Sequence, residues 1–182
     1  MSQPAVIQEV RTEDYRVCRL KPTAEAFGAV IDFLARVKPF SEFRAGVLAG
    51  AVKDQLQHQH HVCALRGTTL IGYCGWILFT EEMGERWLRD QAPFEPVPDD
   101  RANAGALTIV CASDPKVVRR LIRATRERNP GRRVFLRREY SEGHKPVKQT
   151  TVLNYTPSRI GTGDVLTVPA PQDASRSETK AK

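Results

Sequence analysis

Two apolar runs on either side of a short turn do most to limit the folds open to this 182-residue chain. Residues 61–66 read HVCALR, residues 70–79 read LIGYCGWILF, and Gly67-Thr68-Thr69 separates them. Runs of this composition around a glycine-containing turn are typical of a β-hairpin. The fold is therefore expected to contain a β-sheet that includes this hairpin.

Helical patterns surround the hairpin. Apolar residues recur at helical spacing over residues 23–37 and 41–56, with Pro39 between the two helices and Ser41 placed to cap the second. Asp114 and Pro115 are typical of the start of a further helix, in which the proline's missing N–H is no disadvantage. The other elements are expected as a strand at 15–20, a helix at 81–90, a surface loop at 91–103, a strand at 106–112 and a second hairpin at 134–140 and 147–153.

This order of elements predicts an α/β fold with one mixed sheet flanked by helices. The length of the chain fits a single domain, expected over residues 1–155. Residues 156–182 are polar and rich in Pro, Ser and Thr, which predicts a disordered tail.

Positive charge is concentrated in one segment of the chain. The net charge is +7, while residues 116–148 hold twelve Lys or Arg against three acids. That segment alone carries +9, so the rest of the chain sums to −2. Such a segment would attract an acidic partner, although a solvated helix face has the same composition.

The cysteines and the apolar stretches exclude several classes of protein. Cys18, Cys63, Cys74 and Cys111 form no C-x-x-C pair, which predicts reduced, buried thiols and no zinc site or disulfide framework. We expect no membrane span, because no apolar run reaches about 18 residues. The first residues lack the pattern of a signal peptide, so a cytoplasmic location is expected.

The second strand of the hairpin carries the GYCGW motif, Gly72 to Trp76. Upstream, Lys38-Pro39-Phe40-Ser41 breaks a helical region, and downstream the order is a strand, a cationic helix and NPGRRVFLRREY. Over about residues 25–150 this arrangement resembles the RTX toxin-activating lysine acyltransferases. The resemblance implies a GNAT-like fold and the transfer of a fatty acyl group from acyl carrier protein to lysines of a partner protein, such as an RTX-type toxin. Members of that family are often homodimers.

The resemblance also suggests binding residues. A surface for the acidic acyl carrier protein is expected at Arg119, Arg120, Arg123, Arg132 and Arg133. Tyr73 and Trp76 are candidates for an acyl pocket, and because they lie three positions apart on one strand they should face opposite sides of the sheet. The Q/R-x-x-G-x-G/A pyrophosphate loop of coenzyme A users is absent, which favours acylated carrier protein as donor and no bound cofactor.

The catalytic positions differ from the family pattern. The family has a histidine where this chain has Ser41, and an aspartate in the strand that aligns with Leu107-Thr-Ile-Val-Cys111, which holds no carboxylate. Ser41 and His61 are the candidate catalytic residues, with a helix cap as the competing interpretation of Ser41. The stretch Gln57-His58-Gln59-His60-His61 is interpreted as a polar surface linker in preference to a metal site.

Two other functions stay open. A non-catalytic relative could keep the fold and bind acyl carrier protein or another acidic protein through its basic groove. A nucleic-acid binder could use residues 116–148, but that segment offers only Phe135 and Tyr140 for base stacking and no known binding motif.

Overall fold

The computed structural model describes residues 15–90, 95–138, 148–153 and 165–166. The strands are β1 (Arg16–Leu20), β2 (His61–Arg66), β3 (Thr69–Phe79), β4 (Ala104–Ala112), β5 (Arg133–Arg138), β6 (Lys148–Leu153) and β7 (Val165–Leu166). The helices are α1 (Ala24–Leu34), α2 (Ala45–Gln57), α3 (Glu81–Asp90) and α4 (Pro115–Arg128), with a 3₁₀ turn at Phe40–Glu42.

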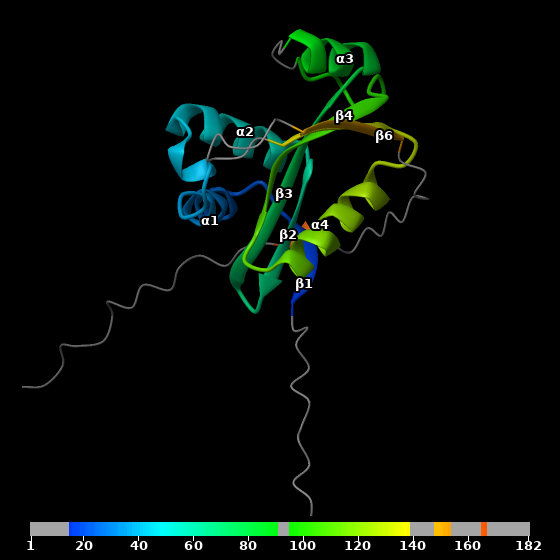
Figure 1. Cartoon of the computed structure of the whole chain (residues 1–182). Helices are drawn as coiled ribbons and strands as arrows, with labels where there is room; N and C mark the ends of the chain where they lie inside the picture. Colours follow the sequence, from blue (N-terminus) through cyan, green and yellow to red (C-terminus); the bar gives the residue numbers. More distant parts are fainter. Residues whose placement is uncertain (1–14, 91–94, 139–147, 154–164, 167–182) are drawn as a thin grey trace, which may run out of the picture.

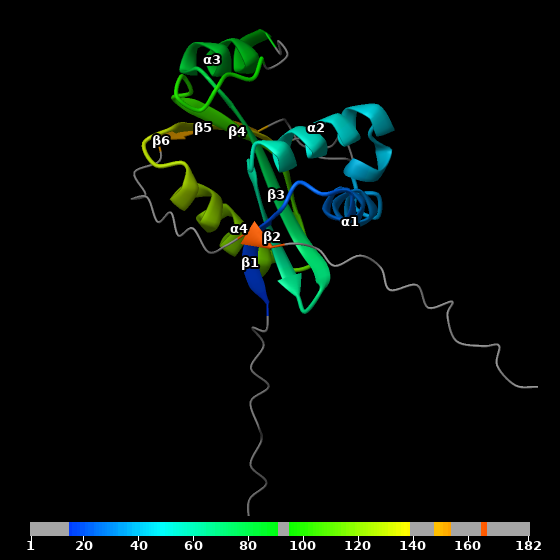
Figure 2. The same ribbon diagram turned by 180° about the vertical axis from the view of Figure 1, so that it is seen from behind.

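The strands form one mixed sheet in the order β6-β5-β4-β3-β2-β1-β7. Helices α1 and α2 cover one face, α4 covers the other, and α3 lies beyond the ends of β3 and β4 (Figures 1 and 2). The predicted α/β class, one mixed sheet flanked by helices, is confirmed. Of the predicted tail 156–182, the described residues include only Val165–Leu166, which pair with β1.

The apolar patterns predicted most of these elements correctly. The two hairpins are β2–β3 and β5–β6, and the tip of the second, with His144, lies outside the described residues. Helix α4 begins as predicted, because Oδ1 of Asp114 accepts a hydrogen bond of 2.7 Å from the backbone N–H of Lys116. Among the described residues, no helix has both the length and the apolar character needed to cross a bilayer.

The start of α2 differs from the prediction. The helix begins at Ala45 with Arg44 at its N-cap, so Ser41 does not cap it. Ser41 lies instead in the 3₁₀ turn, and Phe43, the residue that follows this turn in the chain, has an extended backbone conformation. The buried Phe40 side chain anchors the turn in the core, which separates it from the helix.

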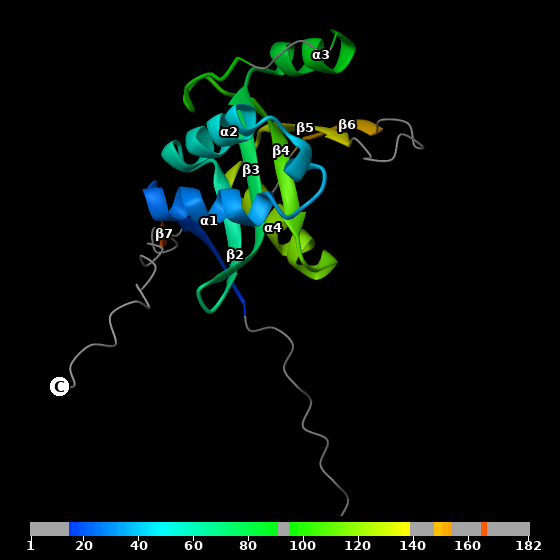
Figure 3. The ribbon, with the colours of Figure 1, turned by 90° about the vertical axis from the view of Figure 1, so that its left-hand side faces the viewer.

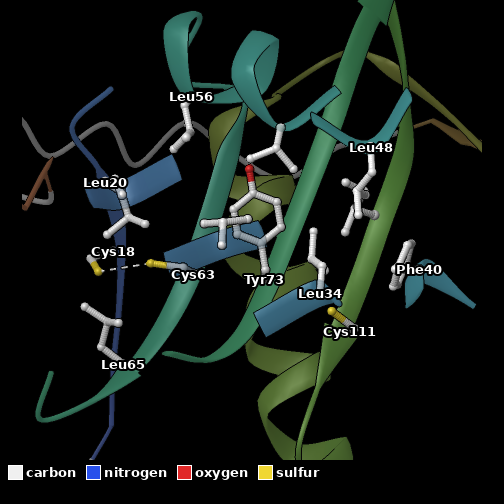
Figure 4. Packing of buried hydrophobic residues seen from close by; sticks show 14 residues of the cluster. Cys18, Leu20, Leu34, Phe40, Leu48, Leu56, Cys63, Leu65, Tyr73 and Cys111 are labelled. Atoms are coloured by element: carbon white, nitrogen blue, oxygen red, sulfur yellow. Dashed lines mark hydrogen bonds between the residues drawn. The ribbon is translucent and has the colours of Figure 1, made fainter. Parts of the chain in front are cut away.

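The core consists of a layer on each face of the sheet. The layer under α1 and α2 is centred on Tyr73 and includes Cys18, Cys63 and Cys111 (Figure 4). Cys18 and Cys63 face each other across β1 and β2, with their sulfurs 3.5 Å apart. All four cysteines are buried, as predicted, and none of them is in a disulfide bond.

The layer under α4 is built from the other side of the same strands and includes Cys74, Trp76 and Leu78. Tyr73 and Trp76 therefore do face opposite sides of the sheet, as strand alternation predicts. A third, smaller cluster joins α3 to the sheet through Phe79 and Phe135.

Strands β4 and β5 are parallel neighbours whose described pairing covers only the beginning of each. They pair from Ala104↔Arg133 to Ala106↔Phe135, while β4 continues to Ala112. In the same region Gly75 of β3 pairs with Ile109 of β4, and the next residue, Trp76, pairs with Leu107. Thr108 is therefore an extra residue in β4 that has no partner position in β3. A bulge of this kind bends the strand that contains it. The described pairing of β4 with β5 thus ends at Ala106 and Phe135, just before the bulge in β4.

Candidate functional site

A pocket of about 170 Å³ lies between α4 and the sheet. Helices α1 and α2 cover the other face of the sheet, which is turned toward the viewer in Figure 3. Its apolar wall is formed by Trp76, Leu78, Leu107, Ile122 and Val134, and its polar side by Thr125, Arg126, Asn129 and Arg132. Gly105 also lines it and pairs with Val134, so the pocket spans the junction of β4 and β5.

Two small residues, Gly105 and Thr125, are among those that line the pocket. A Cβ atom added at Gly105 would lie 3.0 Å from the carbonyl oxygen of Ile77 and 3.1 Å from Cδ2 of Leu78. Thr125 follows Leu121 by one helical turn, and its hydroxyl donates to the Leu121 carbonyl oxygen at 3.0 Å. The same hydroxyl lies 3.3 Å from Sγ of Cys74, so it is satisfied by groups of α4 and β3.

Trp76 contributes the one buried polar atom of the apolar wall. The side chain is 4% exposed, and its indole N–H has no acceptor among the described residues. An unsatisfied buried donor destabilises a fold by about 1–3 kcal/mol. Such a donor is explained when a ligand or water supplies the acceptor.

His60 lies beside Trp76 and makes the only described contact between a histidine and the 95–103 loop. Its ring stacks on the Trp76 ring with centroids 6.0 Å apart, and its Nε2 lies 2.9 Å from Oδ1 of Asp99. The His60 side chain is 11% exposed, whereas that of Asp99 is 65% exposed. Burial lowers the pKa of His60, and the Asp99 carboxylate opposes part of that shift. His60 is therefore neutral near pH 7, the form in which an imidazole can accept a proton.

Arg132 connects the loop of Asp99 to the polar side of the pocket. Its guanidinium donates to the carbonyl oxygens of Asp99 at 3.0 Å and Ala102 at 3.3 Å, and to Oδ1 of Asn129 at 3.0 Å. Because Arg132 and Asn129 both line the pocket, these bonds fix the position of the Asp99 loop relative to it.

A separate polar network lies on the α2 face of the sheet. His61 is fully buried; its Nε2 accepts from the Leu20 N–H at 2.9 Å, so its Nδ1 donates to the Gln55 carbonyl oxygen at 3.1 Å. The Tyr73 hydroxyl donates to Oε1 of Gln55 at 3.1 Å, and Nε2 of Gln55 donates to the Thr108 hydroxyl at 2.8 Å. This network holds α2 against the bulge in β4.

The predicted site residues do not come together in one place. His61 has both ring nitrogens bonded, and burial lowers its pKa to about 4, so it could act as a base only by giving up one of these bonds. Ser41 is exposed on the connection between α1 and α2, on the other face from the pocket. Tyr73 belongs to the α2 network, whereas Trp76 lines the pocket.

The interpretation of the histidine stretch as a surface linker is wrong for two of its members. His60 and His61 are buried because the chain enters β2 there, while His58 remains exposed and lies 3.1 Å from the Asp54 carboxylate. The described residues contain no group of three or more side chains suited to a metal ion. The pairing of His60 with Asp99 was missed, since 39 positions separate them and the loop that contains Asp99 has no sequence pattern.

The five arginines expected to bind a carrier protein occupy two different settings. Arg119 and Arg120 are exposed on α4, and Arg123 on the same helix bonds to Glu127 at 3.1 Å. Arg132 is bonded to the Asp99 loop, as described above. Arg133 pairs with Glu81 at 3.3 Å and with Glu85 at 3.5 Å on α3. Of these five arginines, Arg119, Arg120 and Arg123 on α4 are exposed, whereas Arg132 and Arg133 are partly buried.

No family model and no curated protein matches this chain. Three solved structures are similar to this chain. A mosquito arylalkylamine N-acetyltransferase like 5b has a TM-score of 0.49 at 8% identity, covering 68% of this chain and 76% of that one. An N-acetyltransferase from Staphylococcus aureus Mu50 has a TM-score of 0.39 at 11% sequence identity, covering 67% of this chain and 80% of that one. The PaiA N-acetyltransferase from Thermoplasma acidophilum, in complex with coenzyme A, has a TM-score of 0.40 at 11% sequence identity, covering 72% of this chain and 84% of that one. At these values the likeness decides neither family nor activity.

Proposed function

We propose that this chain transfers an acyl group from acyl carrier protein to a lysine amine of a partner protein, with the acyl chain held in the pocket under α4. The observation that carries this proposal is the His60–Asp99 pair stacked on Trp76, a residue of the pocket wall. Acyl transfer to an amine needs a base for the amine proton and a donor for the developing oxyanion. The neutral imidazole of His60 and the buried, unsatisfied indole N–H of Trp76 belong to stacked rings, and they are the groups we assign to these two roles.

In the proposed reaction the lysine nitrogen attacks the thioester carbonyl carbon. Nδ1 of His60 takes the amine proton as the C–N bond forms, while Nε2–H donates to Asp99, which stabilises the imidazolium. The C–S bond then breaks, and the proton passes to the departing thiolate. The products are an acylated lysine and the free thiol of the carrier.

The start of α4 supports a carrier protein over coenzyme A as donor. A helix N-terminus binds a pyrophosphate through free backbone N–H groups and a partial positive charge. In this chain Asp114 already occupies that position, hydrogen-bonded to the Lys116 N–H, and Pro115 has no N–H to offer. The outward-facing Arg119, Arg120 and Arg123 suit an acidic protein. A cytoplasmic location and a homodimer stay predictions.

The proposal is tested by intact-mass analysis of an acceptor protein rich in exposed lysines. The full chain is incubated with the acceptor and either acylated carrier protein or the matching acyl-coenzyme A. We expect one acyl mass to be added per modified lysine, with faster transfer from the carrier. No added mass with either donor would refute the proposed activity.

The second candidate function is a binding module for an acylated carrier. It is favoured by one observation, namely that none of the candidate catalytic residues Ser41, His60 and His61 is among the residues that line the pocket. A carrier retained by the immobilised protein, with no acyl transfer to any acceptor, would identify this function.

A further inference from the structure

The size of the pocket limits the acyl group that it can hold. An apolar cavity of about 150 Å³ accommodates benzene, which has six carbons. The pocket under α4 measures about 170 Å³. From this comparison we infer that it selects a short acyl chain, of about six carbons, carried as a thioester. The inference rests on the proposed function, since it names the acyl class for the same site.

The walls leave little room for a longer chain. Trp76 and Leu78 form part of the wall from β3 and are almost fully buried, at 4% and 2% exposure. Behind the wall, α4 packs its Leu121 against the same layer of the core. Protein interiors are close-packed, so extending the pocket in this direction would require these side chains to move.

The polar groups of the pocket match a thioester. Trp76, a residue of the wall, has a buried indole N–H with no acceptor among the described residues, and a thioester carbonyl oxygen that reached it would supply one. On the other side the pocket is lined by Arg126, Asn129 and Arg132, and we place the amide-containing arm of a carrier beside these polar residues. The apolar chain and the polar arm thus each find a matching surface.

Isothermal titration of the full chain with acyl-pantetheine thioesters of two, four, six and ten carbons tests this inference. Each buried methylene should tighten binding about fourfold up to six carbons. The ten-carbon ligand should gain nothing further or bind more weakly. Affinity that keeps rising to ten carbons, or that is the same for two and six, would overturn the inference. So would free hexanoate binding as tightly as the hexanoyl thioester.

Two variants locate the binding. Ile122→Trp fills the pocket from α4 and should abolish binding of the hexanoyl ligand. The matched control is Ile31→Trp, the same change at a partly buried isoleucine on the opposite face, and it should leave binding intact. Trp76→Phe keeps an aromatic ring but removes the N–H and part of the wall, so it should weaken binding of the short thioesters and increase the preferred chain length. If Ile122→Trp is folded by thermal denaturation and still binds hexanoyl-pantetheine like the wild type, the ligand lies elsewhere and the inference fails.

The binding series and the transfer assay fail independently. A six-carbon optimum in binding without any transfer would keep the short-acyl site and refute the acyltransferase. Transfer with no dependence on chain length would keep the activity and refute the short-acyl selectivity.

Discussion

Nε2 of His60 lies 2.9 Å from Oδ1 of Asp99, and this contact ties the first residue before β2 to a loop that reaches it only after the chain has passed through β3 and α3. The histidine is nearly buried and the carboxylate is mostly exposed. The pair therefore combines an imidazole kept neutral by burial with an ionised partner that fixes its orientation, beside the wall of an apolar pocket.

Removing the carboxylate should lower the pKa of His60 further. Burial lowers this pKa, while Asp99 raises it; of the other nearby charged groups, Asp54 also raises it and His58 lowers it. In Asp99→Asn the main opposing effect is lost, so the imidazole should titrate at lower pH than in the wild type. Histidine NMR titration measures the change directly. Asp54→Asn, at the exposed partner of His58, is the control and should move the His60 titration much less; an unchanged His60 titration in Asp99→Asn would contradict the contact.

The buried His61 should make the protein sensitive to mild acid. Its pKa is lowered to about 4, chiefly by burial, from 6.5 in the unfolded chain. The unfolded state binds more protons between these values, so stability is lost as the pH falls from about 6.5 toward 4. The free energy of unfolding should drop by about 2 kcal/mol between pH 7.5 and 5 from this residue. Urea denaturation should show that slope reduced in His61→Gln and retained in His58→Gln; equal slopes in both variants would argue against the assignment.

Gly75 should not tolerate a side chain. The amide of Gln55 occupies the space that a Cβ atom at Gly75 would take, and that amide bonds to Tyr73 and Thr108. Gly75→Ala should therefore destabilise the protein by about 1–3 kcal/mol, the usual effect of overpacking a core. Gly50→Ala is the matched control, because nothing lies within 4 Å of the added atom on α2. It should stabilise the protein by about 0.5–1 kcal/mol. Thermal and chemical denaturation of both variants test the prediction, which a stable Gly75→Ala protein would contradict.

Reversing charge on α4 should weaken binding of an acidic carrier. Arg119 and Arg120 are exposed, so Arg119→Glu with Arg120→Glu should reduce affinity at least about tenfold at low salt and flatten its dependence on ionic strength. The control introduces glutamate at Arg44, the N-cap of α2, and at Lys53 within α2, both of which are exposed on the opposite face. Surface plasmon resonance with acyl carrier protein gives both quantities. Equal losses in the two double variants would mean that net charge, and not the α4 surface, governs binding.

The sequence was most informative where pattern and fold coincide. The apolar runs of β2, β3 and β4 and the Asp114 cap of α4 all express a local preference that the structure keeps. The start of α2 was missed because Phe40 packs in the core and holds the preceding turn apart from the helix, an interaction that no local pattern reveals.

The candidate site was less predictable than the fold. Strand alternation placed Tyr73 and Trp76 on opposite faces, but only the packing of α4 shows that the pocket lies on the side of Trp76. The sequence favours His61 as the base because it enters the strand at residues 61–66. In the structure the side chains of the consecutive residues His60 and His61 lie on opposite sides of the sheet. That of His61 contacts Gln55, and that of His60 contacts Trp76 and Asp99.

The rate of acyl transfer by His60→Gln, compared with His58→Gln, tests the central claim most directly. Acylated carrier protein and an acceptor protein are incubated with each variant, and the acceptor's intact mass is followed over time. The account predicts that His58→Gln transfers like the wild type and that His60→Gln is slower by about a hundredfold or more, the usual contribution of a general base. Transfer by His60→Gln at the wild-type rate would contradict it.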